Sequence, residues 1–447
     1  MGTVAGVLST TSAALHARVA RAQRDGRCPS LVAGVVRDGV LAWSAGRGDV
    51  DEPHADVQYR LGSITKTVCA VTVLRLRDEG ALGLDDPLER HLPGTPLGDR
   101  TVGQLLAHLA GATSESPGEW WERAPGTTLE GLGLDAGHVV LPAARRFHYS
   151  NLGYGLLGEL VARARGRSWT DVARDEVLLP LGMARTTPRP SGRAAAGLAV
   201  HPWADAVLPE PEHDAAVMAP AGQLWATAED LGRLGAFLLG DTGDVLAPAT
   251  VAEMAEPAGV DSSAAGWSAY GLGLQVQRTA DADGGSRVLV GHGGSMPGFL
   301  AGLWADRDEG TAALALANTT AGLDGGLPAA LLADVRAHEP RIVGPWTPEP
   351  PPVPLELLGP WFWGPAAYVL RAVPGGMLHL GGLGRPGRSS RFRRGPHGTW
   401  VGLDGYFAGE TLRPGPTALE LATFVFTRTP YDPAAPVPGG VDEAGWR

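Results

Sequence analysis

Ser63 and Lys66 are the two residues whose types and spacing suit nucleophilic catalysis. Lys66 is the only lysine in a chain of 447 residues, and every other strong base is an arginine. An arginine stays protonated in proteins, whereas a buried lysine can lose its proton and then act as a base. Positions i and i+3 of a helix lie on one face, so the Ser63 hydroxyl can meet the Lys66 amine. The pair predicts a serine nucleophile activated by a neutral amine.

The Ser-x-x-Lys spacing is weak evidence when it stands alone, because ordinary helix starts also show it. Two later segments strengthen it. Tyr149 and Asn151 are two residues apart, so they flank one point where the backbone is extended or turning. His292 lies in the glycine-rich run Gly291-His292-Gly293-Gly294-Ser295. For His292, the alternative to a catalytic position is a histidine with its hydrogen bonds satisfied at the edge of a sheet.

Composition and charge limit the possible partners. The chain is 44% hydrophobic and 19% charged, and its net charge is -11, which indicates a globular protein of two or three domains. An acidic chain without basic runs argues against nucleic acid or an anionic membrane as partner. Cys28 and Cys69 do not form a disulfide framework, and Cys69 is expected to be a small buried apolar residue. We expect neither a metal nor a cofactor.

The N-terminus predicts the compartment. Residues 1–11 have no basic segment, and Gly, Thr and Ser interrupt their apolar residues. No stretch of the sequence approaches 18 consecutive apolar residues. We therefore expect no signal peptide, no membrane span and a cytoplasmic location.

The elements that must position these residues follow from local patterns. A hairpin around Asp38-Gly39 and a short strand at 57–59 precede a helix that runs from Ser63 to about Gly80. The long segment 111–147 is rich in Gly and Pro and contains Trp120 and Trp121, so it is a candidate lid, although core packing explains the tryptophans equally well. Further strands are expected at 270–276, 287–290, 299–305 and 312–317, and helices at 13–24, from 84, from 101, at 152–165, at 228–239 and at 328–338.

A proline-rich stretch divides the chain. Residues 344–354 predict a stiff, solvated linker. Beyond it come only short strand-like pieces separated by turn residues, which predict a small all-β domain of sandwich or barrel type. The expected organisation is a catalytic domain at 1–343, the linker, and a β domain at 355–447.

Taken together, the three motifs resemble the serine β-lactamase and penicillin-binding-protein superfamily, especially its class C-like branch. The surrounding segments Leu84-Asp85-Asp86-Pro87-Leu88 and Tyr270-Gly271-Leu272-Gly273 agree with it. The resemblance covers roughly residues 10–340. It implies an α/β (α+β) fold in which helices flank an antiparallel sheet, with an all-α subdomain and the site between them.

The resemblance also implies roles. Ser63 would be acylated, and Lys66 would take its proton, with a pKa lowered by burial and by nearby positive partners. Tyr149 would relay the proton, and Asn151 would orient Lys66 and the substrate amide. His292 stands where many relatives carry lysine, which makes a β-lactam or a free-carboxylate substrate less expected. The residues expected to bind the oxyanion and the substrate backbone are Ser63, Gly293, Gly294 and Ser295, with the N–H groups of Ser63 and Ser295 forming the oxyanion hole.

Within the superfamily, the chain most resembles the penicillin-binding-protein-type thioesterases. The points of resemblance are the position of Ser63, the His292-Gly293-Gly294 variant and a C-terminal lipocalin-like β domain. This class accepts a peptidyl thioester from a carrier domain of a peptide synthetase, usually with a C-terminal D-residue, and releases a head-to-tail macrolactam. The alternatives are a hydrolase that uses water (an esterase, D-aminopeptidase or β-lactamase) and a penicillin-binding-like sensor without turnover.

Overall fold

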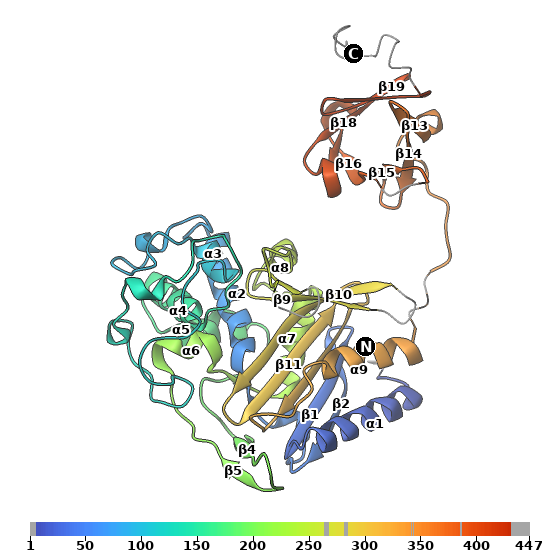
Figure 1. The fold of residues 1–447 in the computed structure, drawn as a ribbon. Coiled ribbons are helices and arrows are strands. Elements are labelled where there is room, and N and C mark those ends of the chain that lie inside the picture. The colour runs from blue at the N-terminus through green and yellow to red at the C-terminus, as the bar shows by residue number, and fades with distance from the viewer. Residues whose placement is uncertain are drawn as a thin grey trace. The chain divides into compact units, whose positions relative to one another are not determined.

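The computed structural model describes residues 6–262, 268–280, 285–340, 342, 344–384 and 387–430. The chain divides into two compact units, residues 1–342 and 343–447 (Figure 1). Each unit is described by itself. Two terminal segments lie outside the described residues. They are residues 1–5, part of the segment in which no signal peptide is expected, and residues 431–447, the end of the expected β domain.

The larger unit is built on an eight-stranded antiparallel sheet with the order β2-β1-β12-β11-β10-β9-β8-β7. The first and last parts of this unit therefore meet within the sheet, where β1 pairs with β12. The strands are β1 (Ser30–Arg37), β2 (Val40–Gly48), β7 (Gly259–Val260), β8 (Ser268–Tyr270), β9 (Gln275–Ala280), β10 (Ser286–Met296), β11 (Phe299–Asp306) and β12 (Thr311–Ala317).

Both faces of the sheet are buried, so the strands carry apolar residues on both sides. On β1, Val32 and Val36 pack into a core shared with helices α2, α4 and α7, whereas Leu31 and Val35 pack into a second core with α1 and α9. Figure 1 shows α1 and α9 on one side of the sheet and α7 on the other. These three helices are α1 (Ser9–Asp25), α7 (Ala228–Leu239) and α9 (Leu327–His338).

A mostly helical region packs against the β10 side of the sheet and completes the mixed α/β fold expected from the motifs. Its α-helices are α2 (Thr65–Asp78), α3 (Val102–Leu106), α4 (Asn151–Arg165), α5 (Trp169–Ala173), α6 (Ala219–Gly222) and α8 (Pro248–Met254). The short helical turns of the larger unit are η1 (His54–Asp56), η2 (Gly62–Ile64), η3 (Leu88–Arg90), η4 (Glu130–Leu132), η5 (Ala136–His138), the π-helical turn η6 (Arg174–Leu178) and η7 (Ala216–Met218). Two small two-stranded sheets pair β3 (Tyr59–Arg60) with β6 (Trp225–Ala226) and β4 (Leu198–Val200) with β5 (Val207–Pro209).

Several local expectations are confirmed. The β1–β2 turn has Asp38 at φ 52° and Gly39 at φ 77°, which is the left-handed pair that a tight hairpin needs. Helix α7 has the expected bounds. The strands β11 and β12 meet at a turn closed by Gly310.

Three local expectations are wrong. The strand expected at 57–59 begins later, as β3, and pairs with β6 outside the main sheet. No α-helix starts at Leu84; the Asp86 carboxylate accepts the Gly83 N–H at 2.8 Å and pairs with Arg90, so the segment closes as a turn before η3. The stretch 270–276 is two strands, because Gly273 at φ 82° turns the chain between β8 and β9.

The smaller unit is a closed barrel of eight antiparallel strands, which settles the choice between sandwich and barrel. Buried side chains such as Trp361, Leu378 and Phe392 fill its interior. Residues 344–352 before it form no helix or strand. The strands are β13 (Gly359–Trp363), β14 (Ala366–Val373), β15 (Met377–Gly382), β16 (Ser390–Arg394), β17 (Trp400–Gly402), β18 (Thr411–Pro414), β19 (Ala418–Leu421) and β20 (Phe424–Thr427), with the short turns η8 (Leu355–Leu357), η9 (Pro396–Gly398) and η10 (Gly405–Phe407).

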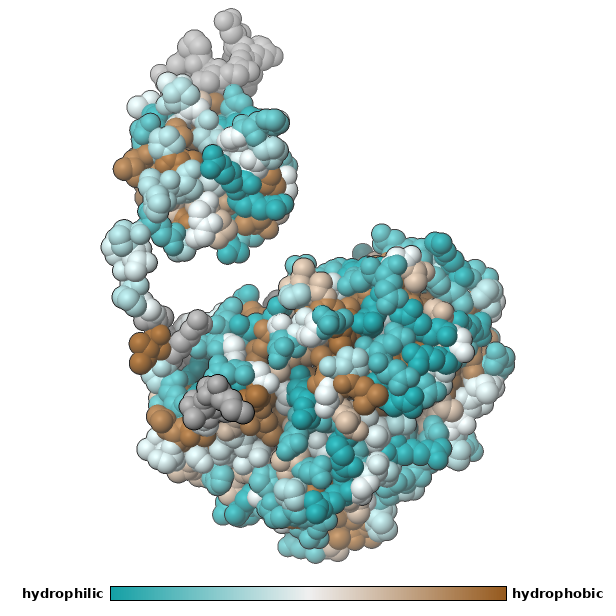
Figure 2. All heavy atoms as spheres, turned by 180° about the vertical axis from the view of Figure 1, so that it is seen from behind, coloured by the Kyte–Doolittle hydropathy of each residue, from teal (hydrophilic) through white to brown (hydrophobic). Residues whose placement is uncertain are grey.

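On the face shown in Figure 2, hydrophilic residues cover most of the larger unit and hydrophobic residues occur in small groups. Within the described ranges, no helix has the length and apolar character needed to cross a membrane.

Candidate active site

Ser63 lies where the chain turns from β3 into α2. Gly62, at φ 55°, makes this turn, and Ser63 follows it in η2 with a partly exposed side chain. The last residue before the turn, Leu61, is fixed because its N–H donates to the Leu224 carbonyl at 2.7 Å. The hydroxyl is thus held by rigid backbone at the edge of the helical region and remains open to a substrate.

Lys66 lies on the first turn of α2 and is fully buried. Its Nζ donates to Ser63 Oγ at 2.9 Å and to the Ala221 carbonyl at 2.7 Å. Burial lowers the pKa of Lys66 to about 7, while the nearby carboxylates of Glu115 and Glu122 oppose the shift. The expected pairing of serine and amine is present, but the expected positive partners are not the cause of the lowered pKa. Desolvation alone produces it.

Tyr149 joins the pair from the start of α4. Its ring centroid lies 5.0 Å from Lys66 Nζ, and the Ser63 hydroxyl is near enough to lower the pKa of its phenol. The position is fixed by the next residue, Ser150, whose Oγ caps α4 by accepting the Gly153 N–H at 2.9 Å. Burial raises the pKa of Tyr149 well above its usual value. A neutral phenol between the nucleophile and solvent can both accept and donate a proton.

Asn151 is near the site but does not orient Lys66. Its Nδ2 donates to Glu115 Oε1 at 2.8 Å and to Oε2 at 3.0 Å. Its Oδ1 is buried and has no hydrogen-bond partner among the described residues. Among the described residues, Asn151 makes no hydrogen bond to Lys66, and the Lys66 amine is instead oriented by the Ala221 carbonyl.

The strand β10 approaches the nucleophile so closely that only glycine fits on both sides. A Cβ on Gly62 would lie 2.4 Å from the Ser295 nitrogen, and one on Gly294 would lie 1.9 Å from the Leu61 carbonyl oxygen. The Ser63 nitrogen would lie 3.4 Å from the latter Cβ. The backbone around Ser295 is thus brought against the backbone around Ser63, which is the arrangement that a two-donor oxyanion hole requires.

The His292 side chain is buried, and both of its ring nitrogens have hydrogen-bond partners within the protein. It is 2% exposed, its Nδ1 donates to the Gly293 carbonyl at 2.5 Å, and Tyr270 donates to its Nε2 at 2.9 Å. Because the carbonyl can only accept, the proton lies on Nδ1, and in a neutral ring Nε2 is then the acceptor for the Tyr270 hydroxyl. Burial lowers the pKa of His292 to about 3. His292 therefore supports β10 as a buried neutral residue and supplies no charge to a substrate.

A second buried histidine, which the sequence did not distinguish from a structural or solvated one, supports Tyr149. His108 is 1% exposed, and its ring centroid lies 4.2 Å from that of Tyr149 and 4.4 Å from that of Tyr270. Its Nδ1 accepts the Ser150 N–H at 3.0 Å. No sequence signal marks this role, because the contact depends on three segments of the chain that meet only in the fold.

Two carboxylates in the segment 111–147 face the site, and sequence reasoning missed both. Glu115 accepts from Asn151 and, at 2.6 Å, from the indole N–H of Trp121. Glu122 accepts from Trp120 at 2.9 Å, and burial raises its pKa. Trp121 is buried, whereas Trp120 is 59% exposed. The candidate lid therefore places negative charge beside Lys66, and its tryptophans position the carboxylates.

The charge of Glu115 can be tested through the protonation of Lys66. Because the carboxylate raises the pKa of Lys66, Glu115→Gln is expected to lower that pKa and to move the acidic limb of the pH–rate profile to lower pH. The matched control is Glu119→Gln, since Glu119 belongs to the same segment but is not among the carboxylates that raise the pKa of Lys66. Equal shifts in the two variants, measured by the rate of Ser63 acylation against pH, would contradict this account.

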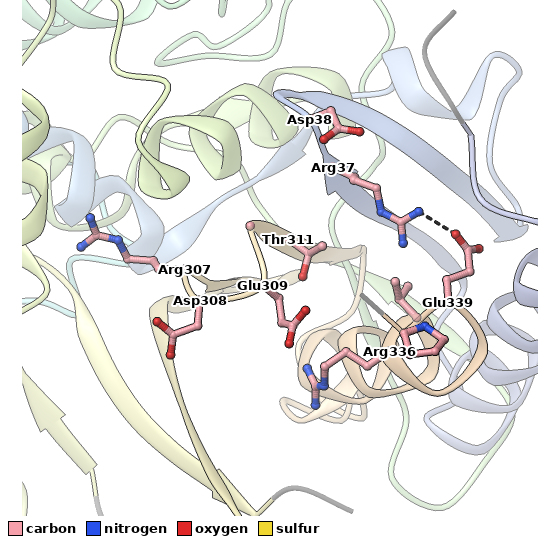
Figure 3. Close-up of a pocket in the computed structure, with 11 residues that line it drawn as sticks. Arg37, Asp38, Arg307, Asp308, Glu309, Thr311, Arg336 and Glu339 are labelled. Carbon is pink, nitrogen blue, oxygen red and sulfur yellow. Dashed lines mark hydrogen bonds and ion pairs between the residues drawn. The ribbon is translucent and has the colours of Figure 1, made fainter. Parts of the chain in front are cut away.

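Three other features of the larger unit were candidates for a functional site: a charged cavity, metal-ligating side chains and the two cysteines. A cavity of about 630 Å³ lies at the turn between β11 and β12. Figure 3 shows the charged side chains that line it, among them Arg37 and Glu339, which form an ion pair at 2.6 Å. Among the described residues, no group of three His, Cys, Asp or Glu side chains could hold a metal ion. Cys28 and Cys69 are both buried and unpaired with each other.

Comparison with known proteins agrees with this geometry. A family model described as Beta-lactamase matches residues 15–337, and a domain of unknown function, DUF7586, matches residues 350–428. A curated relative, Beta-lactamase-like protein 2 of Dictyostelium discoideum, is 26% identical over 263 residues, which are 54% of this chain and 47% of that protein. The chain spans about half the length of the curated relatives it matches.

Solved structures match over more of the chain. The structure of SurE is 25% identical, covers 94% of this chain and 99% of its own, and superposes with a TM-score of 0.59. A D-stereospecific amidohydrolase from Streptomyces sp. is 25% identical, covers 74% of this chain and 98% of its own, and has a TM-score of 0.61.

Proposed function

Because the chain belongs to the Beta-lactamase family, we propose that it is a serine acyltransferase that takes a peptidyl thioester from a carrier domain onto Ser63 and releases it by head-to-tail macrolactamisation. The observation that carries this proposal is the buried Lys66 amine, 2.9 Å from Ser63 Oγ and with a pKa of about 7. Such an amine is neutral in about half the molecules near neutral pH and can accept the serine proton.

The first half-reaction transfers the acyl group. Lys66 Nζ takes the Ser63 proton as Oγ attacks the thioester carbonyl, and the N–H groups of Ser63 and Ser295 receive the oxyanion. The tetrahedral intermediate expels the thiolate, which takes a proton from Lys66 by way of Tyr149. The products are an ester on Ser63, a free thiol on the carrier and a neutral lysine.

The second half-reaction closes the ring. The peptide's own N-terminal amine attacks the ester carbonyl and passes its proton to Lys66 by way of Tyr149. Ser63 Oγ leaves with that proton, and the new amide is the macrolactam bond. The acidic pair Glu115 and Glu122 favours this route over hydrolysis, because their charge draws the peptide's N-terminal ammonium group toward the ester. The ammonium group loses its extra proton to solvent, and the neutral amine that remains then attacks.

Two further observations support the choice of substrate. His292 is neutral and buried, so β10 offers no cationic side chain at that position for a substrate carboxylate, and a thioester donor has none at the reacting residue. The similar structure at 25% identity over 74% of the chain is named a D-stereospecific amidohydrolase, which favours a D-residue at the acyl position. The carrier domain as partner and a cytoplasmic location, with neither nucleic acid nor a membrane involved, belong to this proposal.

The test compares two synthetic thioesters with the same C-terminal D-residue, one with a free N-terminal amine and one with that amine acetylated. We expect the first to yield a cyclic product that is lighter than the linear acid by one water, and the second to acylate Ser63 without cyclising. Mass spectrometry distinguishes the products. Only linear acid from a panel of free-amine substrates would refute cyclisation while leaving the acyl transfer intact.

A second candidate is a hydrolase acting on D-amino acid amides or esters, because Ser63 is partly exposed and water can reach it. Its signature would be turnover of such amides at rates above those of the thioesters. A sensor without turnover would form a stable adduct with penicillin or a fluorophosphonate. Any of the three requires that Ser63→Ala abolish the covalent adduct, and an adduct that persists in this variant would rule out Ser63 as the nucleophile.

The pH dependence of acylation follows from Lys66. Its amine must be neutral to act, and its pKa in the folded protein is lowered to about 7. The acylation rate is therefore expected to rise as pH passes through about 7 and to level off above it. Single-turnover acylation followed by intact-protein mass spectrometry measures this limb directly. A rate that keeps rising toward the ordinary lysine pKa would contradict the assignment.

A further inference from the structure

The smaller unit has an aromatic cluster at one end of its barrel. In an antiparallel barrel, alternate connections share an end, so the described residues 364–365, 383–384, 387–389, 403–410 and 422–423 form one mouth. Three aromatic residues lie at this mouth: Trp363 ends β13, Tyr406 belongs to η10, and Phe424 begins β20. The ring centroids of Trp363 and Phe424 are 5.3 Å apart. Side chains fill the barrel interior below them, so a ligand must bind on this mouth and not inside it.

The three rings surround the guanidinium of Arg388, which lies on the connection between β15 and β16. The distance from Arg388 Cζ to the ring centroid is 4.2 Å for Tyr406, 5.3 Å for Phe424 and 5.4 Å for Trp363. Arg388 is half-buried. Rings on several sides remove water from the guanidinium faces and hold its orientation, which leaves the N–H groups on its edge as the polar contacts available to a ligand.

Arg388 is held among three rings and has no anionic or carbonyl partner among the described residues. Within the described part of the chain, no hydrogen bond or ion pair involves its side chain, whereas Arg391 pairs with Asp404 and Arg428 donates to the Leu358 and Pro360 carbonyls. A guanidinium has five donors and loses little conformational entropy on binding when it is already fixed. The geometry is that of a binding site whose acceptor is supplied from outside.

The surroundings indicate the acceptor. Residues 350–428 contain eight arginines against four acidic residues, although the chain as a whole is acidic. Tyr406 of the cluster is 57% exposed, and Leu383, on the same connection as Arg388, is 46% exposed. A planar carboxylate matches the guanidinium edge bidentately, and an apolar group attached to it would cover the rings. We propose that this mouth binds the C-terminal carboxylate of a short apolar peptide, a proposal that does not depend on the proposed acyl transfer.

The test uses the full chain with Ser63→Ala, so that no peptide is turned over. The probes are N-acetyl-Phe-Leu as the free acid and as its C-terminal amide, titrated by calorimetry. We expect the acid to bind and the amide to bind at least about tenfold more weakly, since it lacks the charge that the guanidinium recognises. Arg388→Met keeps the apolar stem and should weaken binding of the acid by a similar factor.

The matched control is Arg393→Met, because Arg393 is an exposed arginine of the same barrel and its loss changes the net charge equally. This variant should bind the acid as the parent does, and thermal unfolding should show that both variants fold. Equal loss in the two variants, equal binding of acid and amide, no binding of the acid at millimolar concentration, or displacement of the acid by equimolar inorganic phosphate would each overturn the proposal.

Discussion

Replacing Lys66 by arginine is expected to abolish acylation of Ser63 while keeping the positive charge. Lys66 Nζ lies 2.9 Å from Ser63 Oγ, and its pKa is about 7 because it is buried. An arginine in its place stays protonated and cannot take the serine proton. Removing a general base typically costs about 10² to 10⁴ in rate. Intact-protein mass spectrometry of the fluorophosphonate adduct against time measures the loss.

The control for this prediction must separate chemistry from folding, because the arginine would enter a fully buried position. Lys66→Met removes the amine but introduces no buried charge, so it is expected to fold and to be equally inactive. Circular dichroism and the melting temperature report the fold of both variants. A folded arginine variant with parental acylation rates would exclude Lys66 as the base.

Gly294→Ala is expected to cause a comparable loss by moving the oxyanion donors. The added Cβ would lie 1.9 Å from the Leu61 carbonyl oxygen, which is backbone and cannot move aside cheaply. β10 must then shift away from η2 and carry the Ser295 N–H with it. Loss of one oxyanion donor costs about 10² to 10³ in kcat. We expect a fall of this size in single-turnover acylation.

Gly293→Ala provides the comparison on the same strand. A Cβ on Gly293 would meet no atom within 4 Å among the described residues, so the backbone of β10 is expected to stay in place. The neighbouring variant should therefore lose far less of the acylation rate and should melt at the parental temperature. Similar losses for the two glycine variants would show that the methyl group itself, and not the displaced backbone, impairs the site.

The sequence predicted the parts of the site that depend on short-range geometry. Helical spacing brought Ser63 and Lys66 together, and the resemblance of the three motifs to the superfamily implied that Tyr149 and the segment around His292 lie beside them. It did not predict the partner of Lys66, because the Ala221 carbonyl carries no side-chain signature. It also placed a helix at Leu84, where the short-range bonds of Asp86 close a turn instead.

The amino-acid sequence by itself determined which groups could react: one lysine one helical turn from one serine, and glycines at the points where two backbones meet. Only the tertiary structure decided their electrostatics. Burial by segments far apart in the chain lowers the pKa of Lys66 to about 7 and keeps His292 uncharged, while Glu115 and Glu122 oppose the first effect. The physical reason is that contacts within one helical turn follow from local spacing, whereas desolvation depends on how the whole chain packs.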